Sequence, residues 1–114
     1  MIWKDIAVIG LSGEFPGADS IEMFRNNLRS GSDQIGPVPP KRLELLRMDS
    51  KSSYLACGYR SCIDYFDHAA FGISKGEADL LDPQRRRMLE HTWRAFESAG
   101  WRRDRLSGTR TAAL

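Results

Sequence analysis

The apolar run at residues 2–9 constrains the fold of this chain more than any other feature of its sequence. Ala7, Val8 and Ile9 follow one another without polar alternation, which is typical of a β-strand covered on both faces. Such a strand needs paired neighbours, and only residues 111–114 resemble the opening of a second strand. The sequence therefore predicts an α/β fold with one or two strands and a core that its 114 residues do not complete.

Three glycines after this run raise the question of a phosphate-binding loop. Gly10, Gly13 and Gly17 are spaced G-x-x-G-x-x-x-G, whereas a dinucleotide-binding turn requires G-x-G-x-x-G. A P-loop would place a lysine after its second glycine, but Glu14 and Phe15 follow Gly13, and the acid would repel a phosphate. The pattern favours a structural turn. A small nucleotide- or nucleic-acid-binding module remains as the weaker alternative.

A first helix is predicted to follow this turn. Asp19 is expected to be its N-cap, with Glu22 completing a capping box, and Gly31 is expected to end it. Its apolar stripe, which should pack on the strand, consists of Ile21, Phe24 and Leu28. Residues 32–62 contain several prolines and show no sustained period, so they are expected to form a long loop with a helical turn around residues 43–48.

Two further helices are signalled in the second half. Ser74 and Glu77 form a capping box that opens a short helix. Asp82 can cap the main helix, with Pro83 in its first turn and Gly100 at its end. The predicted core consists of Trp93, Phe96, Phe24, Leu28 and Val8.

The composition is that of an ordinary soluble domain, with 41% hydrophobic and 28% charged residues. No stretch near the start is long enough for a signal peptide or a membrane span, so we expect a cytoplasmic protein. Cys57 and Cys62 are then expected to be reduced and buried or half-buried. With His68 and His91 as the only histidines, they do not form a credible zinc site, and no metal is expected.

The charge is unevenly distributed along the chain. The net charge is +2, but from residue 85 onward eight arginines stand against three acidic residues, a local balance of +5. This excess favours an acidic partner, although a solvated basic face would have the same composition. Nucleic acid is not expected as a partner, because no recognised binding module accompanies the arginines. The candidate partner-binding residues are Arg85, Arg86, Arg87, Arg102, Arg103 and Arg105.

Three stretches carry a family resemblance: "IAVIGLSGEFPGADSIEMFRNNLRSGSDQI", "YFDHAAFGISKGEADLLDPQRRRMLEHTWRAFESAG" and "LSGTRTAAL". Together they resemble the N-terminal portion of the ketosynthase (β-ketoacyl synthase) domain of modular, type I polyketide synthases. The resemblance implies a partial thiolase-like fold, helix-rich, for residues 1–114 as one segment. It also implies that the glycines after the first strand form a structural turn. Departures from the family pattern are Cys57-Gly58-Tyr59 and the sequence SKGEA at residues 74–78.

The family's chemistry is decarboxylative Claisen condensation on acyl chains tethered by phosphopantetheine to acyl carrier protein. The resemblance implies a nucleophilic cysteine and two assisting histidines, and no other cofactor. Neither Cys57 nor Cys62 lies in such a cysteine motif, and His68 and His91 lie outside the family's histidine motifs. The catalytic residues are therefore expected beyond Leu114. No catalytic, cofactor-binding or metal-binding residue is assigned here, and whether the chain counts as an enzyme stays open.

Two interpretations of function follow from the resemblance. In the first, the chain is an excised or naturally truncated ketosynthase segment with a noncatalytic structural or docking role. In the second, it is one half of a split active ketosynthase that a second chain completes. Both predict self-association or association with other polyketide synthase domains or subunits, acyl carrier protein among them, and neither involves a membrane.

Overall fold

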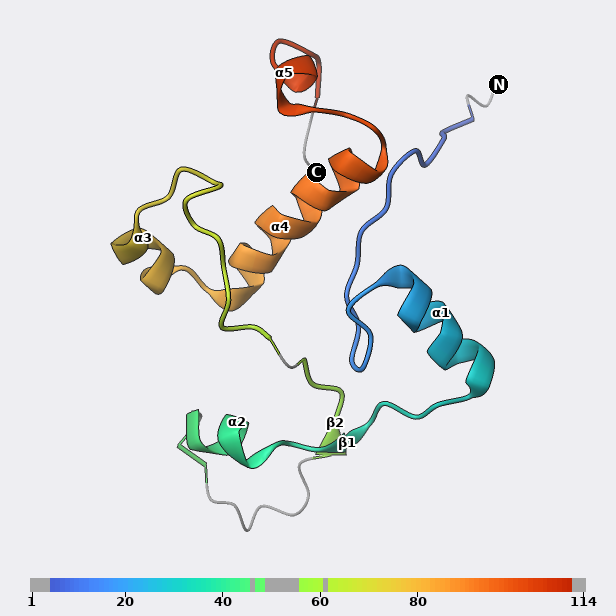
Figure 1. Ribbon diagram of the computed structural model, residues 1–114, viewed down its shortest axis with the longest axis vertical. Helices are drawn as coiled ribbons and strands as arrows, with labels where there is room; N and C mark the ends of the chain where they lie inside the picture. Colours follow the sequence, from blue (N-terminus) through green and yellow to red (C-terminus); the bar gives the residue numbers. More distant parts are fainter. Residues whose placement is uncertain (1–4, 46, 49–55, 61, 112–114) are drawn as a thin grey trace. The chain divides into compact units, whose positions relative to one another are not determined.

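The computed structural model describes residues 5–45, 47–48, 56–60 and 62–111. The elements are α1 (Ile21–Ser30), β1 (Gly36–Pro37), α2 (Pro40–Leu45), β2 (Ala56–Cys57), α3 (Lys75–Leu80), α4 (Pro83–Ser98) and α5 (Arg103–Leu106) (Figure 1). They form two compact units, Met1–Ser12 with Asp64–Leu114 and, separately, Gly13–Ile63. The fold is helix-rich with one two-stranded sheet, in agreement with the predicted class.

Helix α1 begins after Ser20 rather than after Asp19. The backbone of Ser20 is extended (φ -144°, ψ 161°), and its hydroxyl accepts a hydrogen bond from the backbone N–H of Met23 at 3.2 Å. The predicted Asp19 cap and its capping box with Glu22 are therefore wrong by one residue, because the Ser20 hydroxyl makes the capping bond. Gly31 ends the helix as predicted, with φ 65° in the left-handed region.

The sheet lies inside the segment that was expected to be a loop. Strands β1 and β2 are antiparallel, with Gly36 opposite Cys57 and Pro37 opposite Ala56. Two-residue strands are too short to show an alternating pattern, and β1 consists of a glycine and a proline, which is why the sequence did not indicate them. The helical turn expected at residues 43–48 is present as α2, which begins earlier, at Pro40.

The strands predicted at residues 2–9 and 111–114 are not observed in the described part of either segment. Residues 5–9 and Thr111 belong to no strand, while residues 1–4 and 112–114 lie outside the described residues. A strand requires a hydrogen-bonding neighbour, and no described residue pairs with residues 5–9. The apolar side chains of this segment are consequently exposed, Ile6 to 93% and Val8 to 84%.

The capping predictions for the second half are confirmed. The hydroxyl of Ser74 accepts from the backbone N–H of Glu77 at 3.3 Å, and the carboxylate of Glu77 accepts from the backbone N–H of Ser74 at 3.0 Å. The carboxylate of Asp82 accepts from a backbone N–H in the first turn of α4 at 2.7 Å, and Pro83 is the first residue of that helix. Gly100, just beyond α4, has φ 73°.

The core is much smaller than predicted. Among the described residues the buried hydrophobic side chains are Ala18, Leu43 and Ala78. Of the predicted core, Trp93 is 43% exposed, Leu28 65% and Val8 84%, and Phe24 and Phe96 are half-buried.

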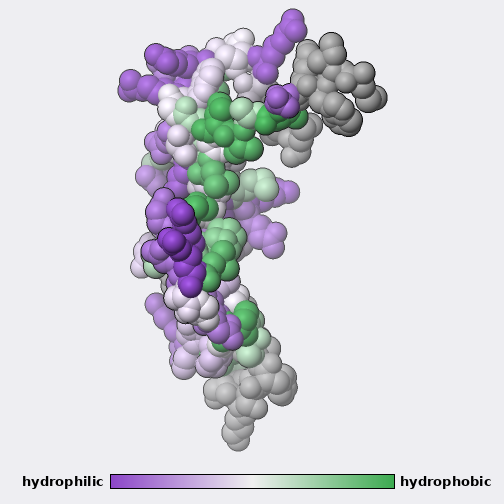
Figure 2. Space-filling view, turned by 90° about the vertical axis from the view of Figure 1, so that its right-hand side faces the viewer, coloured by the Kyte–Doolittle hydropathy of each residue, from purple (hydrophilic) through white to green (hydrophobic). Residues whose placement is uncertain are grey.

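Aromatic side chains pack against one another within each unit. In the unit of Gly13–Ile63, the rings of Phe15 and Phe24 stack with their centroids 3.8 Å apart. In the other unit, the ring of Phe71 meets Trp93 edge-on at 6.3 Å. Figure 2 shows many hydrophobic side chains on the surface. The prediction of a buried face failed because each unit offers too few elements to cover a helix face.

Candidate functional site

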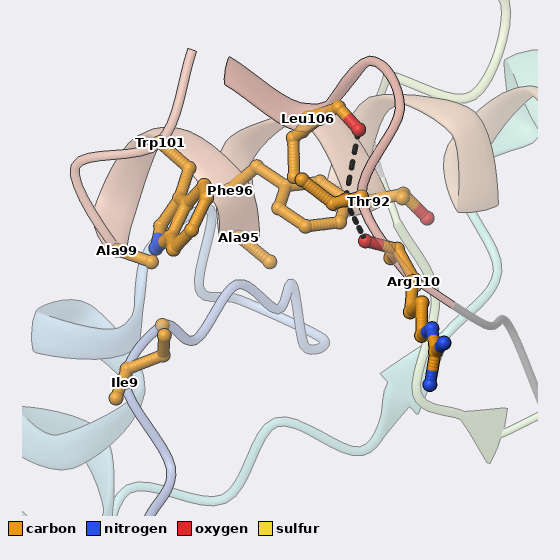
Figure 3. Close-up of a pocket in the computed structure, with 11 residues that line it drawn as sticks. Ile9, Thr92, Ala95, Phe96, Ala99, Trp101, Leu106 and Arg110 are labelled. Carbon is orange, nitrogen blue, oxygen red and sulfur yellow. Dashed lines mark hydrogen bonds between the residues drawn. The ribbon is translucent and has the colours of Figure 1, made fainter. Parts of the chain in front are cut away.

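A groove of about 550 Å³ opens on the C-terminal half of α4 (Figure 3). Its side chains come from three parts of one unit: the N-terminal segment, α4 and the residues after α4. The lining is mainly apolar and includes Ile9, Ala95, Phe96, Trp101, Leu106 and Arg110.

Helical periodicity brings the α4 residues of the groove to one face. The groove includes Thr92 and the residues three, four and seven positions after it, which are Ala95, Phe96 and Ala99. Positions with this spacing lie on the same face of a helix. Gly10 lies against the same helix, because a Cβ atom at this position would overlap the backbone carbonyl oxygen of Ala95. Glycine is thus required at Gly10 by close approach to a helix and not by a bound phosphate.

A Schellman motif returns the chain over the end of α4. The backbone N–H of Trp101 donates to the carbonyl oxygen of Phe96 at 2.9 Å, and that of Gly100 donates to Glu97 at 2.9 Å. This motif usually brings the side chains at these two ends into contact, and Trp101 and Phe96 both line the groove.

Sequence reasoning missed three residues that line the groove. Trp101, Leu106 and Arg110 were not predicted as site residues. The sequence Ala99-Gly100-Trp101 after an amphipathic helix was the available signal, because it predicts an apolar side chain folded back onto the last turn. Helix α5 had no such signal: its four residues are too few for a hydrophobic period, and its N-cap, Arg102, makes no side-chain capping bond.

Both histidines contact groups of the chain itself. The Nδ1 atom of His91 lies 2.8 Å from the hydroxyl of Ser12, which ties the N-terminal segment to α4. The Nδ1 atom of His68 lies 2.7 Å from the carbonyl oxygen of Ile73. Because a carbonyl oxygen only accepts, this nitrogen of His68 carries the proton.

Both cysteines are exposed, which corrects the expectation of buried or half-buried thiols. Cys57 lies on β2, whose two residues are both exposed because the sheet has no third strand among the described residues. No described helix begins at either cysteine, so neither residue is itself part of a helix N-terminus of the kind that stabilises a thiolate in many reactive sites. The part of the chain that the structure describes contains no group of three or more His, Cys, Asp or Glu side chains placed to hold a metal ion.

The three arginines at the start of α4 have different surroundings. The Nε–H of Arg86 donates to the carbonyl oxygen of Leu81 at 2.9 Å. Arg87 forms an ion pair with Glu90 at 2.7 Å, and both side chains are largely buried. Of the three, Arg85 alone is exposed. These residues therefore do not present one uniform basic surface.

The arginines around α5 are more open. Arg102, Arg103 and Arg105 are all exposed, as is Arg110 at the groove. Asp104 is the one acidic residue within α5. The end of this unit that carries the groove is thus also its basic end.

The hydrogen bonds in the cap of α3 favour the charged form of one acid. Donation from the hydroxyl and the backbone N–H of Ser74 lowers the pKa of the Glu77 carboxyl below its ordinary value. This carboxylate is exposed and lies in the cap of α3, so its role is local.

Among the described residues, no helix combines the length and the apolar character required to cross a membrane.

Comparison with known proteins places the whole arrangement in one family. Residues 4–114 match the family described as "Beta-ketoacyl synthase, N-terminal domain". Polyketide synthase PksM of Bacillus subtilis is 40% identical over 92% of this chain. The partially reducing polyketide synthase tpeA of Talaromyces stipitatus is 42% identical over 85% of this chain.

The fold agrees with this match. The oxazolomycin ketosynthase domain OzmH KS7 of Streptomyces albus JA3453 superposes with a TM-score of 0.75 at 34% identity, over 89% of this chain. The chain spans 19% of that ketosynthase, and 2% and 4% of the two polyketide synthases. The sequence resemblance is thereby confirmed, and the chain belongs to the beta-ketoacyl synthase family, in which it corresponds to the N-terminal domain.

Proposed function

We propose that this chain is a structural part of a polyketide synthase ketosynthase and has no acyl-accepting thiol of its own. Condensation would then require further polypeptide that supplies the nucleophilic cysteine and the two histidines. The observation that carries this proposal is the environment of the only two thiols, Cys57 and Cys62, which are both exposed and neither of which belongs to the first turn of a described helix.

The chemistry explains why this environment matters. A thiol that accepts an acyl group needs an adjacent base or positive potential, together with donors for the oxyanion that forms on the thioester. Cys57 lies on an isolated two-stranded sheet, and Cys62 follows it in an irregular segment. His68 donates to a backbone carbonyl and His91 contacts Ser12, so both rings are engaged in contacts of a structural kind.

Exposed apolar side chains support an association with other synthase polypeptides. Ile6, Leu80 and Tyr65 are 93%, 89% and 75% exposed, and hydrophobic residues of this size are rarely left open in such number on a monomer. We propose that the remaining polypeptide of a ketosynthase, or another polypeptide of the synthase, covers them. The exposed arginines would add a salt-sensitive attraction to acidic surfaces, such as those of an acyl carrier protein.

The test is acylation of the purified chain by an acyl thioester, measured by intact mass and peptide mapping. We expect no saturable, stoichiometric acylation of either cysteine. Alkylation by iodoacetamide is the control: both exposed thiols should react, which shows that missing acylation reflects a missing site and not a buried thiol. Saturable acylation that Cys57→Ser or Cys62→Ser abolishes would overturn the proposal.

The alternative of a split active ketosynthase has its own readout. The chain is mixed with a ketosynthase polypeptide that carries the cysteine and histidines but lacks the matching N-terminal part. Acylation of the partner's cysteine only in the mixture would show that the chain completes an active enzyme. Acylation of the partner at the same rate without this chain would exclude that role.

A further inference from the structure

A second, smaller pocket of about 170 Å³ lies against a different face of α4 from the groove. Its helix residues are Glu90 and the residues three, four and seven positions after it, which are Trp93, Arg94 and Glu97. This spacing places them on one helix face. At about 3.6 residues per turn, that face is roughly opposite the α4 residues of the groove. The other wall of the pocket comes from residues 67–71, in the same compact unit.

The segment that forms this second wall is held by its own contacts. The carboxylate of Asp67 accepts a hydrogen bond from the backbone N–H of Ala70 at 3.2 Å. The backbone N–H of Phe71 donates to the carbonyl oxygen of His68 at 3.2 Å, and the ring of Phe66 stacks on that of Phe71 at 5.3 Å. An occupant would therefore meet a preformed wall, which lowers the entropic cost of binding.

Two aromatic rings line the pocket, one from each wall. Phe71 and Trp93 meet edge to face, with their ring centroids 6.3 Å apart and their planes at 79°. Trp93 is 43% exposed, so part of its indole is open to an occupant. The face of an aromatic ring attracts a cation, and indole does so more strongly than phenol or phenyl.

The charged residues of the lining are mainly acidic. Asp67, Glu90 and Glu97 line the pocket together with one base, Arg94. Glu90 is neutralised by its ion pair with Arg87, and Arg94 already has a partner within the chain. The Glu97 side chain is exposed, and no group in the described part of the chain forms a hydrogen bond or ion pair with its carboxylate. A cation would therefore gain an open carboxylate together with an aromatic face, whereas an anion would be repelled.

The size of the pocket limits its occupant to about one side chain. Sites for drug-sized ligands typically measure about 300–1,000 Å³, well above the volume of this pocket. Of the cationic side chains, arginine suits the lining best. Its planar guanidinium stacks on aromatic rings and its fork of N–H donors matches a carboxylate, whereas the lysine ammonium is a compact, strongly hydrated point charge.

We propose that this pocket binds an arginine side chain of a partner protein, with the guanidinium on the Trp93 ring and beside the Glu97 carboxylate. The two side chains are four residues apart on α4, so they are neighbours on its surface and can hold one group together. The partner is a protein that presents this arginine on an exposed segment. The inference goes beyond the proposed function, because it concerns neither the thiols nor the groove.

The experiment titrates the isotope-labelled 114-residue chain with the capped peptide Gly-Ser-Arg-Ser-Gly and follows the backbone amides by NMR. We expect saturable shifts that concentrate in α4 and in residues 67–71. Peptides with citrulline, lysine or glutamate in place of arginine are the matched controls. Citrulline keeps the shape without the charge and should bind at least about fivefold more weakly, lysine at least about twofold more weakly, and glutamate should give no saturable shift.

Substitutions in the pocket test the two groups separately. Glu97→Gln removes the charge at an exposed position and should weaken binding about threefold at low salt. The difference should disappear at about 1 M salt, where the screening length falls to about 3 Å. Glu22→Gln makes the same change on α1, in the other unit, and should leave binding unchanged. Trp93→Leu should weaken binding at least about threefold, and Trp93→Phe, which keeps an aromatic face, should weaken it less.

The inference is overturned if the arginine peptide does not bind, or if citrulline binds as tightly as arginine. Binding that is indifferent to both Glu97→Gln and Trp93→Leu would also overturn it. If no peptide binds while Glu97→Gln weakens self-association of the chain in sedimentation, the occupant is a second copy and not a separate partner. The acylation assay reads the proposed function independently of all these results.

Discussion

Replacement of Gly10 by alanine tests the contact that places the N-terminal segment on α4. An alanine Cβ at this position would overlap the carbonyl oxygen of Ala95 and lie 2.8 Å from the Cβ of Ala99. The carbonyl is backbone in the middle of a helical turn, so it cannot rotate away as a side chain would. It also accepts the N–H of Ala99 at 3.1 Å, so any displacement strains that hydrogen bond.

The expected cost follows from this geometry. Overpacking against a closely packed backbone typically costs about 1–3 kcal/mol. If the segment instead detaches from α4, the contact between Ser12 and His91, at 2.8 Å, is lost as well. In both cases the last turn of α4 opens more often, and because about 1.4 kcal/mol corresponds to a factor of ten, its amides should lose roughly five- to hundredfold of their protection.

Amide hydrogen exchange measures this directly and does not depend on a cooperative melt. In Gly10→Ala the amide of Ala99 should exchange faster, while amides in the middle of α4 change less. Gly76→Ala is the matched control, because a Cβ there meets no atom within 4 Å and lies in helix α3. It should leave Ala99 unchanged and slow exchange within α3. Unchanged exchange at Ala99 in Gly10→Ala would refute the proposed contact.

Four further outcomes are expected. Ser74→Ala removes the cap of α3 and should lower the stability of this helix by about 1 kcal/mol. The first amides of α3 should then exchange faster, and unchanged exchange would show that the cap does not stabilise the helix. Hydrogen bonds from Ser74 lower the pKa of Glu77. The contribution of the Glu77 carboxylate to the stability of α3 is therefore fully present above the ordinary carboxyl pKa, and it is lost as the pH falls through the lowered pKa of the folded state. A pH titration of α3 amide exchange should show this loss in the wild type and not in Ser74→Ala. Trp93→Ala should cost about 1–2 kcal/mol in denaturant unfolding, less than the ~3–5 kcal/mol of a buried aromatic, and a loss in the buried range would mean that the ring is covered. Cys57 and Cys62 should be alkylated at similar rates, and strong protection of one thiol would contradict their exposure.

Local sequence signals predicted local structure well in this chain. The capping box of Ser74 with Glu77 and the cap of Asp82 with Pro83 are where they were expected, because each depends on residues within one turn. The prediction of Asp19 as the cap of α1 was wrong. The side chains of Asp19 and Ser20 can both cap a helix, and the observed cap is Ser20, whose backbone is extended.

Long-range structure could not be predicted in the same way. The run at residues 2–9 has the composition of a strand, but strand formation depends on a partner that no described residue provides. Burial of Trp93 and Val8 was likewise inferred from residue type, whereas burial depends on how many elements are present to cover them. The six candidate arginines could be named from the sequence. The sequence did not show that Arg87 pairs with Glu90 whereas Arg85 is exposed, because all three arginines follow one another in the same stretch.

The central claim is that this chain depends on other polypeptide to cover its apolar surface. Sedimentation of the purified 114-residue chain across a dilution series, with a thermal melt at each concentration, tests this most directly. We expect concentration-dependent self-association, relieved when a ketosynthase polypeptide that covers this surface is added. A compact monomer at micromolar concentration that melts cooperatively by itself would contradict the account, because it would show that the chain completes its own core.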